Sequence, residues 1–214
     1  MANWKKVDVD QLDADLTSVA DAIRERSGTA EALNFPDGFV SAVEGIQDYV
    51  VEYCAGNLTS YRNDKLTIIN GQMFRGHQNT LHYYFPNVTT VSDWSFAQSK
   101  IQTIILPKAT DIYWDNFRDC ANLTTADFGA AKYIQTRVFL SAKSFETLIL
   151  RRTDTVTALY AIDALSGTKI EGGTGYIYVP RSLVDSYKAA TNWSTYANQF
   201  RAIEDYPEIT GGAV

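Results

Sequence analysis

The spacing of hydrophobic residues changes near residue 50, where helix-like intervals give way to short strand-like runs. Upstream of that point, one apolar stripe predicts an amphipathic helix that ends near Gly28; its members are Leu12, Leu16, Val19 and Ile23. A second short helix is predicted after the turn at 35–39, with Phe39, Val43 and Ile46 on one face. Both stripes are narrow, so we expect each helix to pack against another surface.

Downstream of residue 50 the chain repeats itself about every 22 residues. An aliphatic residue is followed five positions later by phenylalanine in four copies: Ile69/Phe74, Val91/Phe96, Ile112/Phe117 and Ile134/Phe139. A strand-like pattern of apolar positions recurs in the same phase, at Ile101/Ile104/Leu106, Leu123/Ala126/Phe128 and Phe145/Leu148/Leu150.

This period, with a strand of that pattern, is typical of a leucine-rich-repeat solenoid, in which neighbouring coils bury one another's inward side chains. The predicted fold class is therefore α+β: a β-rich leucine-rich-repeat solenoid with N-terminal helices and a C-terminal capping helix. We expect coils over 58–180, with the four repeated phenylalanines in one buried column. A β-sandwich with evenly spaced strands is the alternative.

The repeat weakens after residue 150, which indicates the end of the solenoid. A glycine-rich turn at 172–175 leads into a last predicted strand at 176–180. Ser182 and Asp185 form a variant capping box, which predicts the start of a capping helix. An apolar plug is expected to close the end, from Trp193, Tyr196 and Phe200. The predicted domains are a helical attachment segment at 1–49, the solenoid at 50–180 and a cap at 181–214.

Composition excludes several classes of protein. The 214 residues are 45% hydrophobic and 21% charged, with no apolar run of 18 residues, which excludes wholesale disorder and a membrane span. With 25 acidic and 19 basic residues the net charge is −6, which disfavours nucleic acid and anionic membranes as partners. Only two histidines and two cysteines are present. We therefore expect no enzyme activity, no cofactor and no metal site.

The residues that could carry chemistry have simpler structural interpretations. His77 and His82 lack nearby acidic or cysteine partners in the sequence, so we interpret them as surface histidines. The glycine run at 172–175 lacks the Lys-Ser/Thr of a phosphate loop. Cys120 is expected to be a small buried hydrophobic residue. Three acidic residues recur every four positions and are expected to face solvent, with a cation site as the alternative: Asp111, Asp115 and Asp119.

Comparison of the copies predicts two contact surfaces. The three positions after the aliphatic residue are mostly polar and should face water, yet Trp94, Tyr113 and Trp114 occupy them in adjacent coils. These rings could form one aromatic patch that binds a carbohydrate or protein, or they could pack on the N-terminal helices or a neighbouring subunit. On the strands, Thr103, Thr125 and Thr147 recur at intervals of 22, as a structural ladder or as a flat polar ligand surface.

Several of these stretches resemble known proteins. Residues 84–91, 120–124, 177–180 and 184–193 are similar to BspA-type leucine-rich repeats. Residues 16–24 and 35–39 resemble N-terminal segments of phage and prophage proteins of gut Firmicutes. The third repeat departs from the pattern, because Gly129-Ala130 stands where the first has Pro-Asn. The repeat family includes surface adhesins and phage proteins, so the resemblance implies a role in surface contact.

These observations predict a phage virion structural protein, a tail- or capsid-attached fibre or receptor-binding component. The expected partners are other virion proteins, further copies of the chain, and a host cell-surface protein or glycan. Virion attachment is assigned to the N-terminal stripes: Leu12, Leu16, Val19, Ile23, Phe39 and Val43. The N-terminal sequence lacks the pattern of a secretion signal, which favours assembly in the host cytoplasm. A bacterial surface adhesin, which should carry an export signal and a wall anchor, is the alternative.

Overall fold

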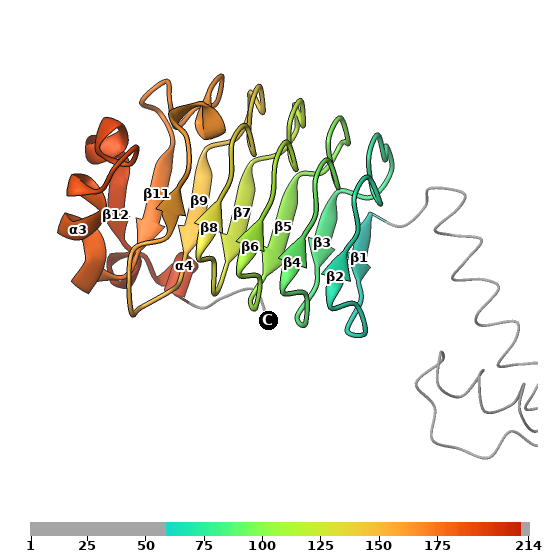
Figure 1. Cartoon of the computed structure of the whole chain (residues 1–214), viewed down its shortest axis with the longest axis horizontal. Helices are drawn as coiled ribbons and strands as arrows, with labels where there is room; N and C mark the ends of the chain where they lie inside the picture. Colours follow the sequence, from blue (N-terminus) through green and yellow to red (C-terminus); the bar gives the residue numbers. More distant parts are fainter. Residues whose placement is uncertain (1–58, 211–214) are drawn as a thin grey trace, which may run out of the picture. The chain divides into compact units, whose positions relative to one another are not determined.

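The computed structural model describes residues 59–210, which wind into successive coils between two parallel sheets (Figure 1). The predicted N-terminal helices, with their attachment residues Leu12, Leu16, Val19, Ile23, Phe39 and Val43, lie outside the described residues. The long sheet has seven strands in the spatial order β1-β3-β5-β7-β9-β11-β12. Their bounds are Ser60–Arg62, His82–Tyr84, Thr103–Leu106, Thr125–Phe128, Thr147–Leu150, Tyr176–Val179 and Phe200–Ala202.

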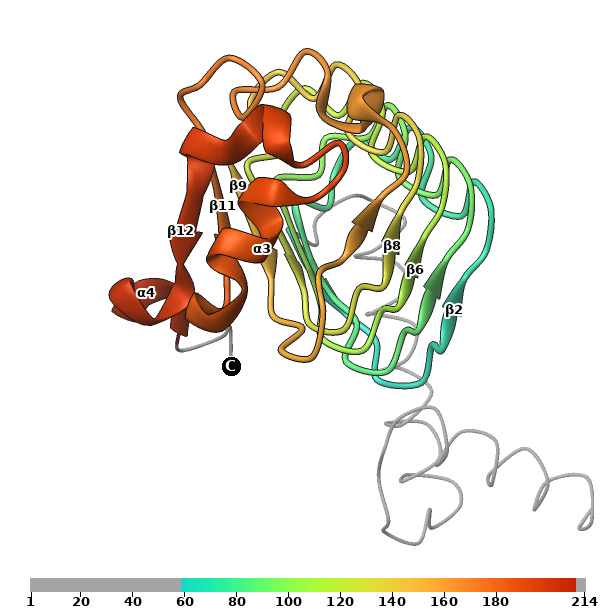
Figure 2. The ribbon, with the colours of Figure 1, turned by 60° about the vertical axis from the view of Figure 1, so that its left-hand side comes forward.

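The second sheet is built from two-residue strands, one from each coil. In spatial order they are β2, Ile68–Ile69; β4, Thr90–Val91; β6, Asp111–Ile112; β8, Tyr133–Ile134; and β10, Ala158–Leu159. The two sheets lie on opposite sides of the coils, and the hydrophobic core fills the space between them (Figure 2). The predicted β-rich repeat architecture is therefore confirmed for the described part of the chain.

The 22-residue period corresponds to one full turn of the coil. Thr103 pairs with Thr125, and Thr125 pairs with Thr147, so equivalent residues of successive repeats are direct neighbours in the sheet. The next residue of each strand points inward and is buried, as Ile104 and Leu148 show. Every coil thus covers the inward side chains of the one before it, as expected of a solenoid.

The repeated phenylalanines form the predicted buried column. The centroids of consecutive rings are 5.0, 5.3 and 5.4 Å apart, and the rings are stacked within 15° of parallel. Phe145 adds a further stacked ring, 4.2 Å from Phe139. All five are buried: Phe74, Phe96, Phe117, Phe139 and Phe145.

Two residues in each inner coil adopt the left-handed backbone conformation. They follow the second-sheet strand by three and seven positions, at Gln72, Trp94, Asp115 and Arg137 and at Gly76, Gln98, Asp119 and Ser141. Side chains other than glycine adopt this conformation at a cost of about 1–2 kcal/mol each. The same two bends recur in each inner coil, although the residue types at these positions differ.

The C-terminal cap consists of short helices and a last strand. After the 3-10 helix η1 (Ile162–Leu165) and β11, the elements are η2 (Arg181–Leu183), α3 (Val184–Ala189), η3 (Ser194–Gln199), β12, η4 (Ile203–Asp205) and α4 (Pro207–Thr210). The capping helix is confirmed, but the capping box is wrong. Ser182 lies within η2, and α3 begins at Val184 with no side-chain cap hydrogen bond.

The predicted apolar plug is confirmed and is anchored by hydrogen bonds. Trp193 and Tyr196 are buried, and the Trp193 indole donates to the Thr157 carbonyl at 2.6 Å. The Tyr196 hydroxyl donates to the Ile162 carbonyl. Phe200 is buried too, but it belongs to β12, which extends the long sheet by pairing in parallel with β11.

Candidate ligand-contact surfaces

The outer face of the long sheet carries two columns of side chains, because alternate strand residues point to the same side. Strand register places six residues in the first column: Ser60, His82, Thr103, Thr125, Thr147 and Tyr176. The same register places seven in the second column: Arg62, Tyr84, Ile105, Asp127, Ile149, Tyr178 and Arg201. All members of the first column are exposed or half-buried.

The predicted threonine ladder therefore exists as a row of register neighbours within the first column. Its first member, Thr103, shares a hydrogen bond with His82, whose Nδ1 lies 2.8 Å from the threonine Oγ1. The column continues past His82 to Ser60. This extension was not predicted, because neither residue is threonine.

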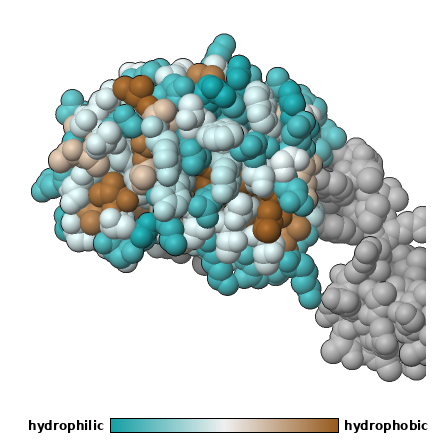
Figure 3. All heavy atoms as spheres, viewed as in Figure 1, coloured by the Kyte–Doolittle hydropathy of each residue, from teal (hydrophilic) through white to brown (hydrophobic). Residues whose placement is uncertain are grey.

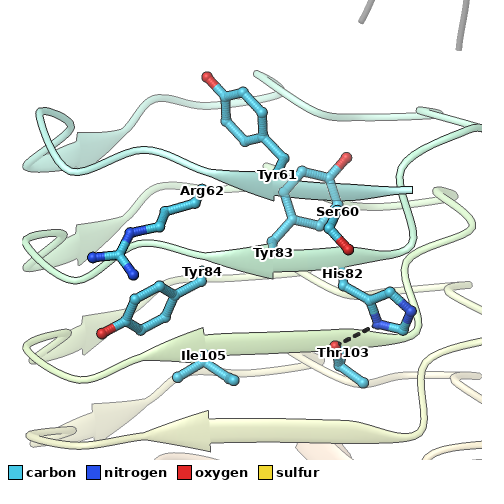
Figure 4. Close-up of a pocket in the computed structure, with 8 residues that line it drawn as sticks. All are labelled: Ser60, Tyr61, Arg62, His82, Tyr83, Tyr84, Thr103 and Ile105. Carbon is cyan, nitrogen blue, oxygen red and sulfur yellow. Dashed lines mark hydrogen bonds between the residues drawn. The ribbon is translucent and has the colours of Figure 1, made fainter. Parts of the chain in front are cut away.

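A shallow hollow lies at the end of this face formed by β1, β3 and β5 (Figure 4). Its lining residues are Ser60, Tyr61, Arg62, His82, Tyr83, Tyr84, Thr103 and Ile105. The Arg62 guanidinium lies 4.8 Å from the centre of the Tyr84 ring. It also bonds Asp64 at the rim, which raises the arginine pKa further and keeps the group charged. Among residues 59–210, no carboxylate lines the hollow. Its lining side chains supply one cation, one imidazole and several hydroxyls.

At the opposite end of the face, the second column is covered by the chain itself. Ile149, Tyr178 and Ile203 form a small apolar cluster, against which Tyr206 and Ile209 pack. This C-terminal segment, Ile203–Thr210, comprises η4 and α4. The rings of Tyr178 and Tyr206 meet edge to face at 5.0 Å. Nothing in the repeat pattern predicts this contact.

An arginine fixes the C-terminal segment to the sheet. The Arg151 guanidinium donates to the Ile209 carbonyl at 2.7 Å and to both oxygens of Asp127 at 2.7–3.0 Å. Asp127 is buried, so this bidentate pair compensates a carboxylate that would otherwise be costly to desolvate.

The predicted aromatic residues do not form one stacked patch. Trp114 is 49% exposed and Tyr113 38% exposed, and the Trp114 indole donates to the Gln135 side chain at 3.1 Å. Trp94 is half-buried, with the guanidinium carbons of Arg75 and Arg118 at 4.9 and 5.4 Å from its ring centre. In residues 59–210, no ring contact joins these three aromatics to one another. Trp94 is therefore engaged by arginines of the neighbouring coils.

Asp115 corrects the expectation that its position faces water. Its side chain is only 1% exposed and accepts two hydrogen bonds from Arg137 of the next coil, at 2.8 and 3.0 Å. Arg118 adds a longer contact of 3.4 Å. The left-handed backbone at Asp115 aims its carboxylate at the next coil, which the residue type alone does not indicate.

A second pair of exposed aromatics lies on the short sheet. Tyr133 of β8 and Tyr160, directly after β10, are 39% and 55% exposed, and their ring centres are 5.8 Å apart. On the side seen in Figure 3, strongly hydrophobic residues form small separate groups among polar ones. That side of the molecule therefore carries small apolar groups rather than a broad apolar band.

The remaining candidate residues have structural roles. Cys120 is buried as predicted, and burial raises the pKa of its thiol to about 11. His77 is half-buried rather than on the open surface; its Nδ1 lies 2.8 Å from the Tyr83 hydroxyl, and burial lowers the pKa of its imidazole. Between residues 59 and 210, no group of acidic, histidine and cysteine side chains could hold a metal ion, and no helix is long and apolar enough to span a membrane.

Comparison with protein families gives a match over residues 33–165, described as a BspA type leucine rich repeat region in six copies. A search of curated proteins finds no match. The family match begins at residue 33, within the segment predicted to be helical and upstream of the described residues. The match covers more than half of the sequence, and the structure repeats in coils of 22 residues. The chain therefore belongs to the BspA-type leucine-rich-repeat family.

Proposed function

We propose that this chain is a non-enzymatic, adhesin-like binding protein that contacts its partner through the outer face of the long sheet. The observation that carries the proposal is the open part of that face. The first column presents a row of hydroxyls and one imidazole on β1, β3, β5 and β7. The C-terminal segment covers only the second column, at β9 and β11. Solenoid proteins commonly bind through such extended, regularly spaced surfaces.

The chemistry of this face supports binding rather than catalysis. His82 shares its hydrogen bond with a threonine hydroxyl, not with a carboxylate that would orient it as a general base. The most deeply buried carboxylates, Asp115 and Asp127, are each held by an arginine. The proposal accordingly includes no cofactor.

Retention on cells tests the proposal. Labelled protein should be retained on intact cells of gut Firmicutes, and Thr125→Arg, at the centre of the open face, should reduce retention at least tenfold. Thr67→Arg makes the same change at an exposed position next to β2 on the other sheet and should leave retention unchanged. Absence of retention, or equal loss in both variants, would contradict the proposal.

The exposed aromatics are proposed as a second contact. Trp114→Ala should weaken partner binding by at least about 2 kcal/mol if the ring is a binding hot spot. Because half of this side chain is exposed, the thermal midpoint should change little. A large loss of stability would instead assign Trp114 a packing role.

In its more specific form, the proposal is that the chain is a phage virion component assembled in the host cytoplasm. The resemblance of residues 16–24 and 35–39 to phage proteins favours this form, and membership in the repeat family favours the alternative, a bacterial surface adhesin. Residues 1–49 would then attach the chain to other virion proteins or to further copies.

Purified particles distinguish the two forms. An antibody against the solenoid should detect the chain in phage particles, and deletion of residues 1–49 should abolish its incorporation. Detection on the surface of cells that release no particles would favour the adhesin.

A further inference from the structure

The C-terminal segment shows what kind of ligand the second column can hold. Its apolar residues Ile203, Tyr206 and Ile209 pack on Ile149 and Tyr178, and Arg151 binds a backbone carbonyl of the segment. Three consecutive members of the column are buried there: Asp127, Ile149 and Tyr178.

The same segment is acidic. Its eight residues include Glu204, Asp205 and Glu208 and no basic residue. The Glu204 carboxylate accepts from the Arg181 backbone amide, and Asp205 pairs with the Arg181 guanidinium. The segment thus combines apolar side chains that contact the sheet with carboxylates that meet a cation.

The members of the column on β1, β3 and β5 are exposed or half-buried and line the hollow: Arg62, Tyr84 and Ile105. We call these three residues the open track. They continue the column that the C-terminal segment occupies, and no segment within residues 59–210 covers them. Figure 4 shows Arg62, Tyr84 and Ile105 one below another on successive strands. An arginine lies against a tyrosine at the other end of the sheet as well, where Arg201 stacks on Tyr176 at 4.3 Å.

The charge of the open track complements an acidic ligand. Its cation, Arg62, bonds Asp64 in a pair whose side chains are 59% and 53% exposed. Such exposed pairs are weak, so an incoming carboxylate can replace Asp64 at little cost. His82 and Ser60 of the neighbouring column add hydrogen-bonding groups to the same hollow.

We propose that the open track binds an acidic peptide segment of a partner protein, in the way that the C-terminal segment occupies the covered end of the column. Ile105 and Tyr84 contact the apolar side chains of the peptide, and Arg62 binds a carboxylate beside them. This inference rests on the proposed binding function and specifies the ligand class at one end of the face.

The probe is a fluorescein-labelled peptide with the sequence of residues 203–210, added to the intact chain and followed by fluorescence anisotropy. Saturable binding is expected, and Ile105→Asp and Arg62→Glu should each weaken it at least tenfold. Ile68→Asp introduces the same charge at an exposed position of β2 on the other sheet and should change the affinity less than twofold. A peptide with lysine at its three acidic positions should not bind.

Two results would overturn the inference. The first is that the peptide shows no saturable binding to the wild-type chain, while circular dichroism shows that the chain is folded. The other is loss of binding in Ile149→Asp but not in Ile105→Asp, because the peptide would then be replacing the chain's own C-terminal segment. Retention on cells without peptide binding would refute only the peptide-binding track; peptide binding without retention would refute only the adhesin-like function.

Discussion

Replacing Phe117 by alanine tests the core of the solenoid most directly. The ring is fully buried and stacked between Phe96 and Phe139, at centroid distances of 5.3 and 5.4 Å, with Phe128 at 6.3 Å. Truncation of a buried phenylalanine costs about 3–5 kcal/mol, the sum of lost apolar burial and the cavity that remains. Because neighbouring coils lie on both sides of Phe117, the site can collapse little, and we expect the upper part of that range.

The assay is urea unfolding followed by far-ultraviolet circular dichroism, with Tyr113→Ala as the control. Tyr113 is an exposed aromatic four residues away, so its truncation should cost less than about 1 kcal/mol. A solenoid is stabilised by contacts between neighbours, so Phe117→Ala should also split the transition into two steps. A cost below about 1 kcal/mol with a single transition would refute the stacked column as the main source of stability.

Three further substitutions test individual features. Gly129→Ala should cost about 3 kcal/mol in thermal unfolding, because the added Cβ would lie 2.0 Å from the Pro107 carbonyl oxygen. Gly172→Ala is the control and should be nearly neutral, because the atoms nearest to its Cβ would be 3.6 Å away. The Cys120 thiol has an ordinary pKa near 9 in the unfolded chain and a pKa of about 11 in the folded one. The free energy of unfolding should therefore be constant below pH 9 and fall by about 2–3 kcal/mol toward pH 11. Cys120→Ala should remove this contribution in denaturation curves measured at about pH 8 and 10.5. Arg137→Met should lower the free energy of unfolding in urea by about 2 kcal/mol, because it leaves the buried Asp115 carboxylate without its main partner. No change would mean that Arg118 replaces Arg137 as that partner.

The solenoid could be predicted from the sequence because the same physical constraint acts in every coil. An inward strand residue and a phenylalanine are needed once per turn, so Ile104 and Phe117 have counterparts 22 residues away. The end of the solenoid was harder to predict, because β12 and the C-terminal segment occur once and have no sister copy for comparison.

The candidate surfaces were predicted only in part. The threonine ladder followed from the strand period, but the hollow beside it depends on Arg62, His82 and Ile105, which have no common residue type. The buried position of Asp115 depends on backbone conformation and on Arg137 of the next coil. A position-by-position comparison of copies misses both effects, because it treats each coil separately. A search for acid–arginine pairs one period apart would have found this one.

The corner at Gly129, where one coil passes close to the one before it, bears on how the protein can change in length. Its amide donates to the Leu106 carbonyl, and its bare Cα lets the chain pass close to Pro107 of the preceding coil. Because each coil contacts mainly its immediate neighbours, duplication of one 22-residue unit within the stack would preserve the pairing at both new junctions. Each added unit would move the two ends apart by about 4.8 Å, the spacing between paired strands. Relatives with different numbers of units would thus differ in the length of the solenoid, in steps of one strand, while keeping the same cap.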